Sequence, residues 1–268
     1  LPIYGIGYWR LDGTASVVDN QGTWTLNSTN QSLITNSETF TNSGTIDITA
    51  GSFQVTHTGT GTSTTSGTVQ GAGAFGATNG TFNYTGGSFA PAAATLSNLT
   101  ANFTSAMTLG TDGPDDLTLT TVNLTAPNGL TNPDTFAQTF TSVTSSSPIV
   151  NNGTLTMTGT STLDSLTTGT TSSLALTGSV TFPTAFTNNG AMSFGSSGSR
   201  VTVTTGTFTN SATGTLTAAA NNAWIAYITG DFTNAGTVDG AGYWRLDGTA
   251  SVVDNQGTWT VNSTVQSD

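Results

Sequence analysis

Acidic side chains are the residues of this chain whose type and spacing come closest to enzyme chemistry. A glycosidase needs two carboxyl groups about 5–10 Å apart, on either side of the bond that is cleaved. Aspartates gather near the end of the chain, at Asp231, Asp239, Asp247 and Asp254. If they lie on neighbouring turns of a repetitive fold, pairs of them meet that distance, so a polysaccharide-cleaving enzyme is one hypothesis.

The rest of the catalytic inventory is sparse. The single histidine, His57, continues the alternation of Phe53 and Val55, which favours a strand-end residue over a general base. The sequence contains no lysine and no cysteine, which excludes lysine-based covalent catalysis, thiol nucleophiles, thiolate metal sites and disulfides. We therefore expect that the protein is not an enzyme and uses no cofactor.

One acidic turn is a weak candidate for binding calcium, a hard cation that prefers oxygen ligands. It consists of Asp112, Asp115 and Asp116 around Gly113-Pro114. The spacing matches neither the EF-hand loop nor the nonapeptide calcium repeat. A solvated acidic loop is therefore the expected structure, with calcium as the alternative.

The net charge excludes two classes of partner. At −11 and a pI of about 4.1, the chain lacks the basic surface that binding to phosphates requires. An anionic membrane surface repels it for the same reason, and no apolar run approaches the ~20 residues that span a bilayer. We expect no nucleic-acid partner and no membrane insertion in this segment.

The strongest pattern is an internal repeat. Residues 7–32 return at 242–267 with only two differences, Leu26 against Val261 and Asn30 against Val265. The offset between residue 7 and residue 242 is 235 residues. This predicts that 7–241 is one unit and that 242–268 is the start of the next.

A shorter pattern runs inside the long one: an Asn, a turn ending in Gly, a Thr, and then an apolar–polar–apolar triplet. Residues 20–26, 42–48 and 188–194 are examples. Asn and Gly tolerate left-handed backbone geometry, which predicts a turn. Thr and the alternation that follows predict a strand with one buried face. An aromatic residue two positions before the Asn recurs at Phe40, Phe186, Phe208 and Phe232.

The spacing of these rungs indicates the architecture. Successive asparagines are 22 residues apart from 20 to 42 and from 188 to 210, then 24 and 21 apart to 234 and 255. Such a unit fits one coil of a solenoid. We predict an all-β fold, a right-handed parallel β-helix with about 21–24 residues per coil and roughly 11–12 coils. We expect residues 1–268 to form one continuous solenoid.

The rungs resemble the β-helical stalks of large bacterial surface proteins, such as autotransporter-type and filamentous-haemagglutinin-type adhesins. The resemblance rests on the rung pattern and on a composition in which Ser and Thr make up roughly a third of the residues. It implies an extracellular or cell-surface location and carries over no catalytic residue.

The residues at the rung positions are expected to carry the structural function, through core packing and hydrogen bonding. Alternation places Trp9, Leu11 and Trp24 in the core, although a sugar-stacking platform is the alternative for this Trp/Tyr cluster and its repeat. The asparagines are expected to form amide ladders along the axis. The full set of structural and interaction residues is Tyr8, Trp9, Arg10, Trp24, Phe40, Asn42, Phe186, Asn188, Phe208, Phe232, Asn234, Tyr243, Trp244, Arg245, Asn255 and Trp259.

Function then follows from stacking. We expect a structural extracellular filament or cell-surface stalk whose partner is itself, end to end, either as tandem units or as separate subunits. The first alternative is an adhesin that binds surface glycans through outward residues such as Tyr8 and Arg10. Outward Thr-x-Thr pairs at 154–156 and 202–204 leave a further alternative, binding to ice or to a crystal surface.

Overall fold

The computed structural model describes residues 3–5, 10–133, 135–196, 198–218, 225–240, 243–247 and 251–261. The described chain is all-β, without a helix, and its parallel strands stack as a β-solenoid of about 11 turns. This confirms the predicted fold class. The chain divides into two compact units, Leu1–Leu130 and Thr131–Asp268. The continuity of one rod over 1–268 and the hand of the winding stay predictions.

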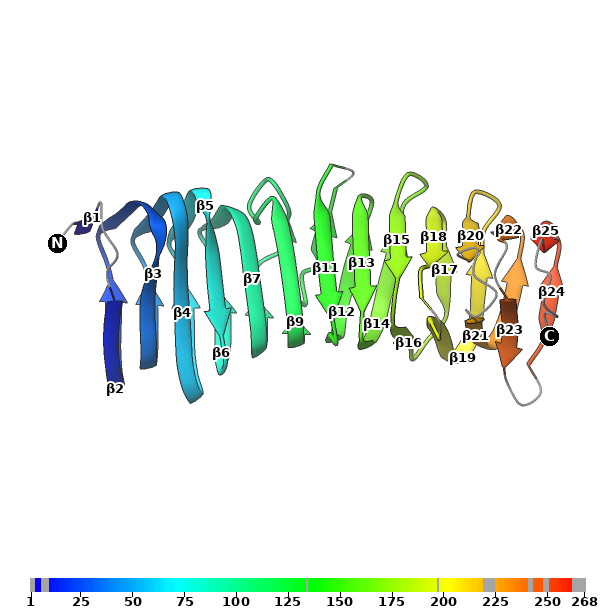
Figure 1. Cartoon of the computed structure of the whole chain (residues 1–268), viewed down its shortest axis with the longest axis horizontal. Helices are drawn as coiled ribbons and strands as arrows, with labels where there is room; N and C mark the ends of the chain where they lie inside the picture. Colours follow the sequence, from blue (N-terminus) through cyan, green and yellow to red (C-terminus); the bar gives the residue numbers. More distant parts are fainter. Residues whose placement is uncertain are drawn as a thin grey trace. The chain divides into compact units, whose positions relative to one another are not determined.

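The first unit is a stack of parallel coils (Figure 1), and its N-terminal half contains the longest strands. Its strands pair in parallel from β2 with β3 up to β7 with β9. Their bounds are β1 (Ile3–Gly5), β2 (Arg10–Asn20), β3 (Thr23–Asn42), β4 (Thr45–Thr65), β5 (Thr68–Thr78), β6 (Thr81–Tyr84), β7 (Ser88–Phe103), β8 (Met107–Thr108) and β9 (Asp116–Thr125).

The second unit repeats the arrangement with shorter strands. The strands that follow its Asn-Gly turns, together with one strand that lacks such a turn (β15, Ser173–Leu176), stack in one column. The column consists of β13 (Thr154–Thr158), β15, β18 (Ala191–Phe194), β20 (Thr215–Ala218), β22 (Thr237–Gly240) and β25 (Thr258–Val261). Strand β10 (Leu130–Asn132) contains the point where one unit gives way to the next. The other strands are β11 (Ala137–Thr141), β12 (Thr144–Asn151), β14 (Thr160–Thr168), β16 (Ser179–Phe182), β17 (Phe186–Asn188), β19 (Arg200–Asn210), β21 (Ile225–Asn234), β23 (Tyr243–Asp247) and β24 (Val253–Asn255).

Coil length varies more than the sequence predicted. Asn20 bonds to Asn42 across 22 residues, within the expected 21–24. Leu174, however, pairs with Met192 only 18 residues later, and Asn132 bonds to Asn151 across 19. The predicted lower limit was therefore wrong: the coil shortens where its corners lose residues, while the stacked strands keep their register.

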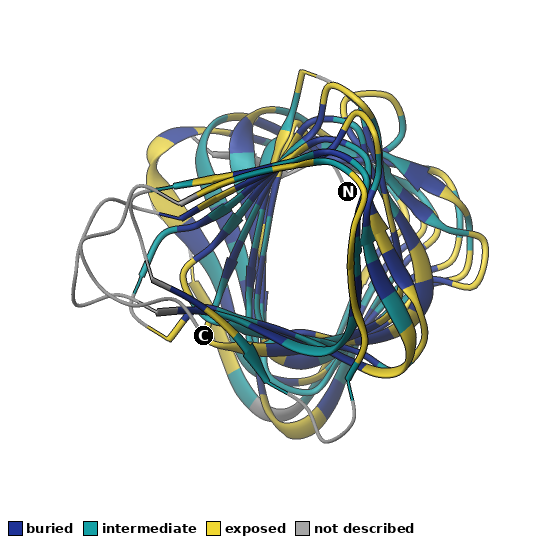
Figure 2. Ribbon diagram, turned by 90° about the vertical axis from the view of Figure 1, so that its right-hand side faces the viewer, coloured by how far each residue is buried: buried dark blue, intermediate teal, exposed yellow. Residues whose placement is uncertain are grey.

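The interior of each unit is built from alternate strand residues. Figure 2, turned by 90° from Figure 1, shows buried and exposed positions alternating along the coils. In the first unit one interior column runs through Trp24, Ile46, Val69 and Phe89, all buried and paired in turn. Each such side chain contributes about 1.5–3 kcal/mol by leaving water, so stacking the coils supplies stability that one coil lacks.

Candidate functional site

A column of buried asparagine side chains links consecutive coils of the second unit. The Nδ2 of Asn188 donates to Oδ1 of Asn210 at 3.0 Å, and Asn210 donates to Asn234 at 2.8 Å. Asn234 continues the column to Oδ1 of Asn255 at 2.8 Å. Each amide therefore satisfies the next one along the stack, which is the ladder that the sequence predicted.

The first unit begins with the same ladder and then changes its chemistry. Asn20 donates to Asn42 at 2.8 Å, and Asn42 donates to the hydroxyl of Thr65 at 3.1 Å. Tyr84 and Phe103 follow in register, so the column becomes aromatic. The burial of Tyr84, together with the Asp112 carboxylate, raises the pKa of its hydroxyl, which donates to the Gly87 carbonyl at 2.9 Å.

One rung of the ladder in the second unit is a threonine. Thr168 pairs in register with Asn151, and its hydroxyl donates to the carbonyl of Thr187 at 3.2 Å. Among the described residues, the buried Oδ1 of Asn188 accordingly has no hydrogen-bond partner. A buried acceptor without a partner costs free energy, so this rung is a weak point of the column.

The left-handed geometry predicted for the Asn-x-Gly turn was wrong. Neither Asn42 nor Gly44 has a positive φ in this structure, and neither does Gly236. The glycine is needed because backbones approach closely: a Cβ on Gly44 would overlap the carbonyl oxygen of Gly22 in the coil below. Gly236 lies in the same way over Gly214. These turns therefore require the smallest residue rather than a left-handed one.

Aromatic rings form the second interior column. Phe186, Phe208 and Phe232 follow one another with ring centroids 5.4 and 5.3 Å apart, and the ring of Trp259 lies 5.9 Å from that of Phe232. In the first unit Trp24 lies 6.2 Å from Phe40. These spacings are typical of favourable aromatic pairs.

Burial decides between the core and the sugar-stacking hypotheses for most of the Trp/Tyr cluster. Trp24 is buried and Trp244 is 1% exposed, so both are core residues. Leu11, however, is 43% exposed, against the prediction, although it pairs with the buried Ile34. No other described coil covers Leu11 closely enough to bury it. Tyr8, Trp9 and the side chain of Tyr243 lie outside the described residues.

An outward column of the second unit gathers both of its arginines around one tyrosine. Arg200, Tyr227 and Arg245 are in register on β19, β21 and β23. The guanidinium carbons lie 4.3 and 5.8 Å from the ring centroid, which are cation–π distances. Asp247 lies 2.7 Å from Nε of Arg245 and 3.7 Å from Nη2 of Arg200. We call these four residues the Arg–Tyr column.

The sequence pattern did not reveal Asn132 of the asparagine column or Tyr227 of the Arg–Tyr column. Asn132 was overlooked because Pro and Asp follow it in place of x-Gly, yet it donates to Asn151 at 2.8 Å. The signal was the Leu130-Thr-Asn132 triplet, which has the same apolar–x–Asn pattern as Phe186-Thr-Asn188. Tyr227 was missed because nothing in a single strand reveals its neighbours on adjacent coils.

The described residues of the predicted calcium turn do not form a metal site. Asp112 turns inward to accept a hydrogen bond from the Thr108 amide at 2.6 Å, while Asp115 and Asp116 are exposed. In the part of the chain that the structure describes, no three acidic or histidine side chains form a group that could hold a metal ion. Asp231 accepts from the Val252 amide at 2.8 Å.

The other aspartates of the glycosidase hypothesis point to solvent or to arginine. Asp239 and Asp254 are exposed, and Asp254 accepts a hydrogen bond from Gln256 at 2.5 Å. Asp247 belongs to the Arg–Tyr column. Asp231, Asp247 and Asp254 thus each have a local partner: a backbone amide, an arginine and a glutamine.

His57 lies inside the first unit and joins three segments. Its Nδ1 lies 2.9 Å from the carbonyl of Ser37, and its Nε2 lies 2.7 Å from the hydroxyl of Ser63. The imidazole therefore donates from Nδ1 and accepts at Nε2. Burial lowers its pKa, and the hydrogen bond to the Ser37 carbonyl offsets part of that shift. The sequence predicted a strand-end residue, which was wrong: His57 lies within β4, eight residues before its end at Thr65, and its side chain is buried.

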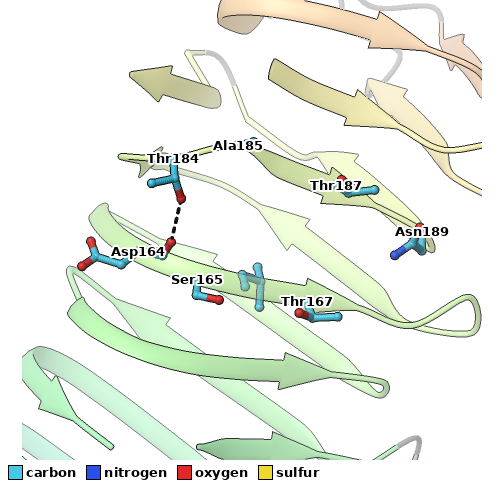
Figure 3. Close-up of a pocket in the computed structure, with 8 residues that line it drawn as sticks. Asp164, Ser165, Thr167, Thr184, Ala185, Thr187 and Asn189 are labelled. Atoms are coloured by element: carbon cyan, nitrogen blue, oxygen red, sulfur yellow. Dashed lines mark hydrogen bonds between the residues drawn. The ribbon is translucent and has the colours of Figure 1, made fainter. Parts of the chain in front are cut away.

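A shallow polar cavity of about 240 Å³ lies on the outside of the second unit. Figure 3 shows its lining along β14 and around β17, with the Thr184 hydroxyl donating to the Asp164 carbonyl. Asp164 is the only ionisable residue among the described residues that line it. The cavity holds no nucleophile–base pair and no second carboxylate.

The two outward Thr-x-Thr pairs stack differently. Thr154 pairs with Ala137 on one side and Ser173 on the other, so its column of threonines is interrupted. Thr202 pairs with Thr181 and Thr229, so three threonines lie in register, on a strand that also carries Arg200. Binding to ice or to a crystal surface stays a prediction.

Comparison with protein-family models, with curated proteins and with solved structures found no match to this chain. The described residues include no helix of the length and apolarity that crossing a membrane requires.

Proposed function

We propose that the chain is a structural part of an extracellular filament or cell-surface stalk, built by stacking β-solenoid coils along one axis. The observation that carries this proposal is the pair of interior columns. The phenylalanine column ending at Phe232 and the asparagine column ending at Asn234 both continue into the repeated segment, at Val253 and Asn255. The sequence repeat thus coincides with uninterrupted stacking, which is what an extended load-bearing element needs.

Composition supports the same role. The chain has no cysteine and no lysine, so its strength comes from backbone pairing, amide ladders and packed rings. The resemblance to the stalks of bacterial surface adhesins supports a location outside the cell. The proposed role needs no catalysis, cofactor or metal ion.

Two measurements test this proposal. Antibodies raised against the chain should label intact cells of the organism that makes it, and external protease should remove the label. A single molecule pulled by its ends should resist force and then lengthen in steps of one or a few coils. Labelling only after cell lysis, or extension at low force without steps, would contradict the proposal.

A glycan-binding adhesin on the same scaffold is the second candidate, and the Arg–Tyr column favours it. Arg200 and Arg245 keep 37% and 49% of their side-chain surface exposed beside a tyrosine ring, a combination suited to an acidic sugar. Retention on an array of acidic glycans should be lost in R200Q/R245Q and kept in R10Q. Equal retention of all three chains would remove this candidate.

A further inference from the structure

The two copies of the repeat share two side-chain contacts. Nε of Arg10 lies 2.7 Å from Asp12, and Nε of Arg245 lies 2.7 Å from Asp247. A glutamine–aspartate hydrogen bond of 2.5 Å also recurs in both copies. These described parts of the repeat are therefore alike in both places, although their neighbours differ.

The first copy packs on the coil that follows it. Strand β2 and the start of β3 pair with the end of β3 and with β4, and the inner residues meet in register. The pairs are Val18 with Phe40, Asn20 with Asn42, Trp24 with Ile46, and Leu26 with Ile48.

The second copy packs on the coil that precedes it. Strands β24 and β25 pair with β21 and β22, using the equivalent residues of the repeat. The pairs are Phe232 with Val253, Asn234 with Asn255, Val238 with Trp259, and Gly240 with Val261. The first copy of the repeat coil therefore shows how the following coil packs on it, and the second copy shows how the preceding coil packs on it.

In the first copy, one face of the repeat coil is covered by the following coil. In the second copy, the same face is more exposed. Asn20 is buried, whereas its counterpart Asn255 is exposed. Trp24 is buried, whereas Trp259 keeps part of its surface exposed. Val253 is 44% exposed although it belongs to the interior column. An indole ring and an amide that are buried in the first copy are therefore more exposed in the second.

We propose that the repeat coil formed by β23, β24 and β25 receives the Leu33–Ile48 segment of a following unit, so that successive units share a single repeat coil. Phe40 of the following unit would lie on Val253, Asn42 on Asn255, and Ile46 on Trp259. The inference rests on the proposed filament and specifies its junction. Both interior columns then pass from one unit to the next without a gap.

Charge favours this junction over the alternative, in which the repeat of one unit stacks directly on the repeat of another. If the repeat of one chain docked on the repeat of another, Arg10 would lie over Arg245, Asp12 over Asp247 and Asp19 over Asp254. Like charges on adjacent strands repel at a spacing of ~4.8 Å.

A shared coil avoids these contacts. In the first copy Arg10, Asp12 and Asp19 pair with Leu33, Thr35 and Thr41, all uncharged. In the second copy the equivalent residues, Arg245, Asp247 and Asp254, pair with Tyr227, Thr229 and Thr233, also uncharged. Every charge of the shared coil therefore meets a neutral neighbour on each side.

Hydrogen exchange on three chains tests the junction. The first is the chain of residues 1–268. The second joins residues 1–267 to residues 33–268 of another copy, which creates a shared coil. The third joins residues 1–268 to residues 7–268, which places repeat after repeat. We expect amides of 253–261 in the first half of the shared-coil chain to exchange at least tenfold more slowly than in the single chain, and those of the third chain to show no such gain.

A matched pair of variants checks that burial causes the protection. V253D in the shared-coil chain should abolish the gain, because this side chain would lie under Phe40. V252D should keep it, because Val252 is 63% exposed on the outside. Slow exchange around Val55 in the first unit shows that each chain is folded.

Three results would overturn the inference: equal exchange of 253–261 in the single and shared-coil chains, protection of the repeat-after-repeat chain alone, or loss of protection throughout the shared-coil chain. If single chains instead polymerised end to end with 253–261 protected, repeat-on-repeat stacking would replace this junction, and the proposed filament would stand. Cell-surface labelling and pulling experiments test the filament independently of the junction.

Discussion

Asn210 and Asn234 lie one above the other on successive coils, and the amide nitrogen of Asn210 donates to the side-chain oxygen of Asn234 at 2.8 Å. The same nitrogen also reaches the carbonyls of Gly214 and Thr237, both at 3.1 Å. One buried side chain therefore joins its own turn to two positions on the coil above. This relationship, repeated along each unit, couples neighbouring coils.

Removing one amide should weaken the second unit. N210A removes one of the acceptors of the Asn188 amide, which keeps the Gly190 carbonyl, and leaves the Asn234 oxygen without the Asn210 donor. A buried polar group without a partner costs about 1–3 kcal/mol. We expect urea denaturation to show a loss of about 2–3 kcal/mol for N210A. The control N152A alters a half-buried asparagine outside the ladder and should change the free energy of unfolding by less than about 0.5 kcal/mol. Equal losses would show that the ladder contributes nothing specific.

Completing the ladder should strengthen it. T168N places an amide between Asn151 and Asn188, where it can donate to the unpartnered Oδ1 of Asn188. We expect a gain of about 1 kcal/mol in the free energy of unfolding of the second unit. T167N, on the exposed neighbour, should be neutral. A T168N chain less stable than the unaltered chain would mean that the shorter coil has no room for the amide.

Glycine at the turns should be irreplaceable for steric reasons. In G236A the new Cβ overlaps the carbonyl oxygens of Gly214 and Ser211, so the two coils must separate locally. We expect a loss of about 2 kcal/mol or more. In G195A the nearest atom is a methyl group of Thr177 at 3.2 Å, which can shift, so its loss should be well below that of G236A. Thermal unfolding of both variants measures the difference.

Acid should destabilise the first unit through His57. Burial lowers the pKa of this imidazole in the folded chain. Below about pH 6.5 the imidazole of the unfolded chain therefore binds a proton while that of the folded chain stays neutral. Stability is therefore present above that pH and is lost as the pH falls towards the folded-state pKa. Urea midpoints measured between pH 8 and pH 5 should fall in the unaltered chain. The fall should be smaller in H57Q, and an identical profile in both chains would exclude His57 as the cause.

The sequence was sufficient to predict the fold because each coil repeats the same local signals. Phe208 two residues before Asn210, and the strand after the following glycine, recur at intervals that only stacking explains. Strand β15 keeps this register without an Asn-x-Gly turn before it, since Leu174 pairs with Leu155 on one side and Met192 on the other.

The remaining features depend on contacts between coils that no single segment encodes. Arg200 and Tyr227 meet because β19 and β21 pair in register, and their cation–π contact is not apparent from either strand alone. The glycines of the turns were predicted to serve left-handed geometry. Their close approach to a carbonyl oxygen of the neighbouring coil cannot be recognised from the local sequence. Asn132 was missed because its turn is built differently.

Cysteine pairing tests the central claim, that equivalent residues of successive coils lie directly above one another. The chain has no cysteine of its own, and Thr187, Thr209 and Thr233 form one outward column in register. Adjacent parallel strands are ~4.8 Å apart, within the Cα range that a disulfide spans. Mild oxidation should crosslink T187C/T209C and T209C/T233C almost completely and leave T187C/T233C, two coils apart, reduced. Crosslinking of T187C/T233C with no crosslinking of the adjacent pairs would contradict the stacked-coil account.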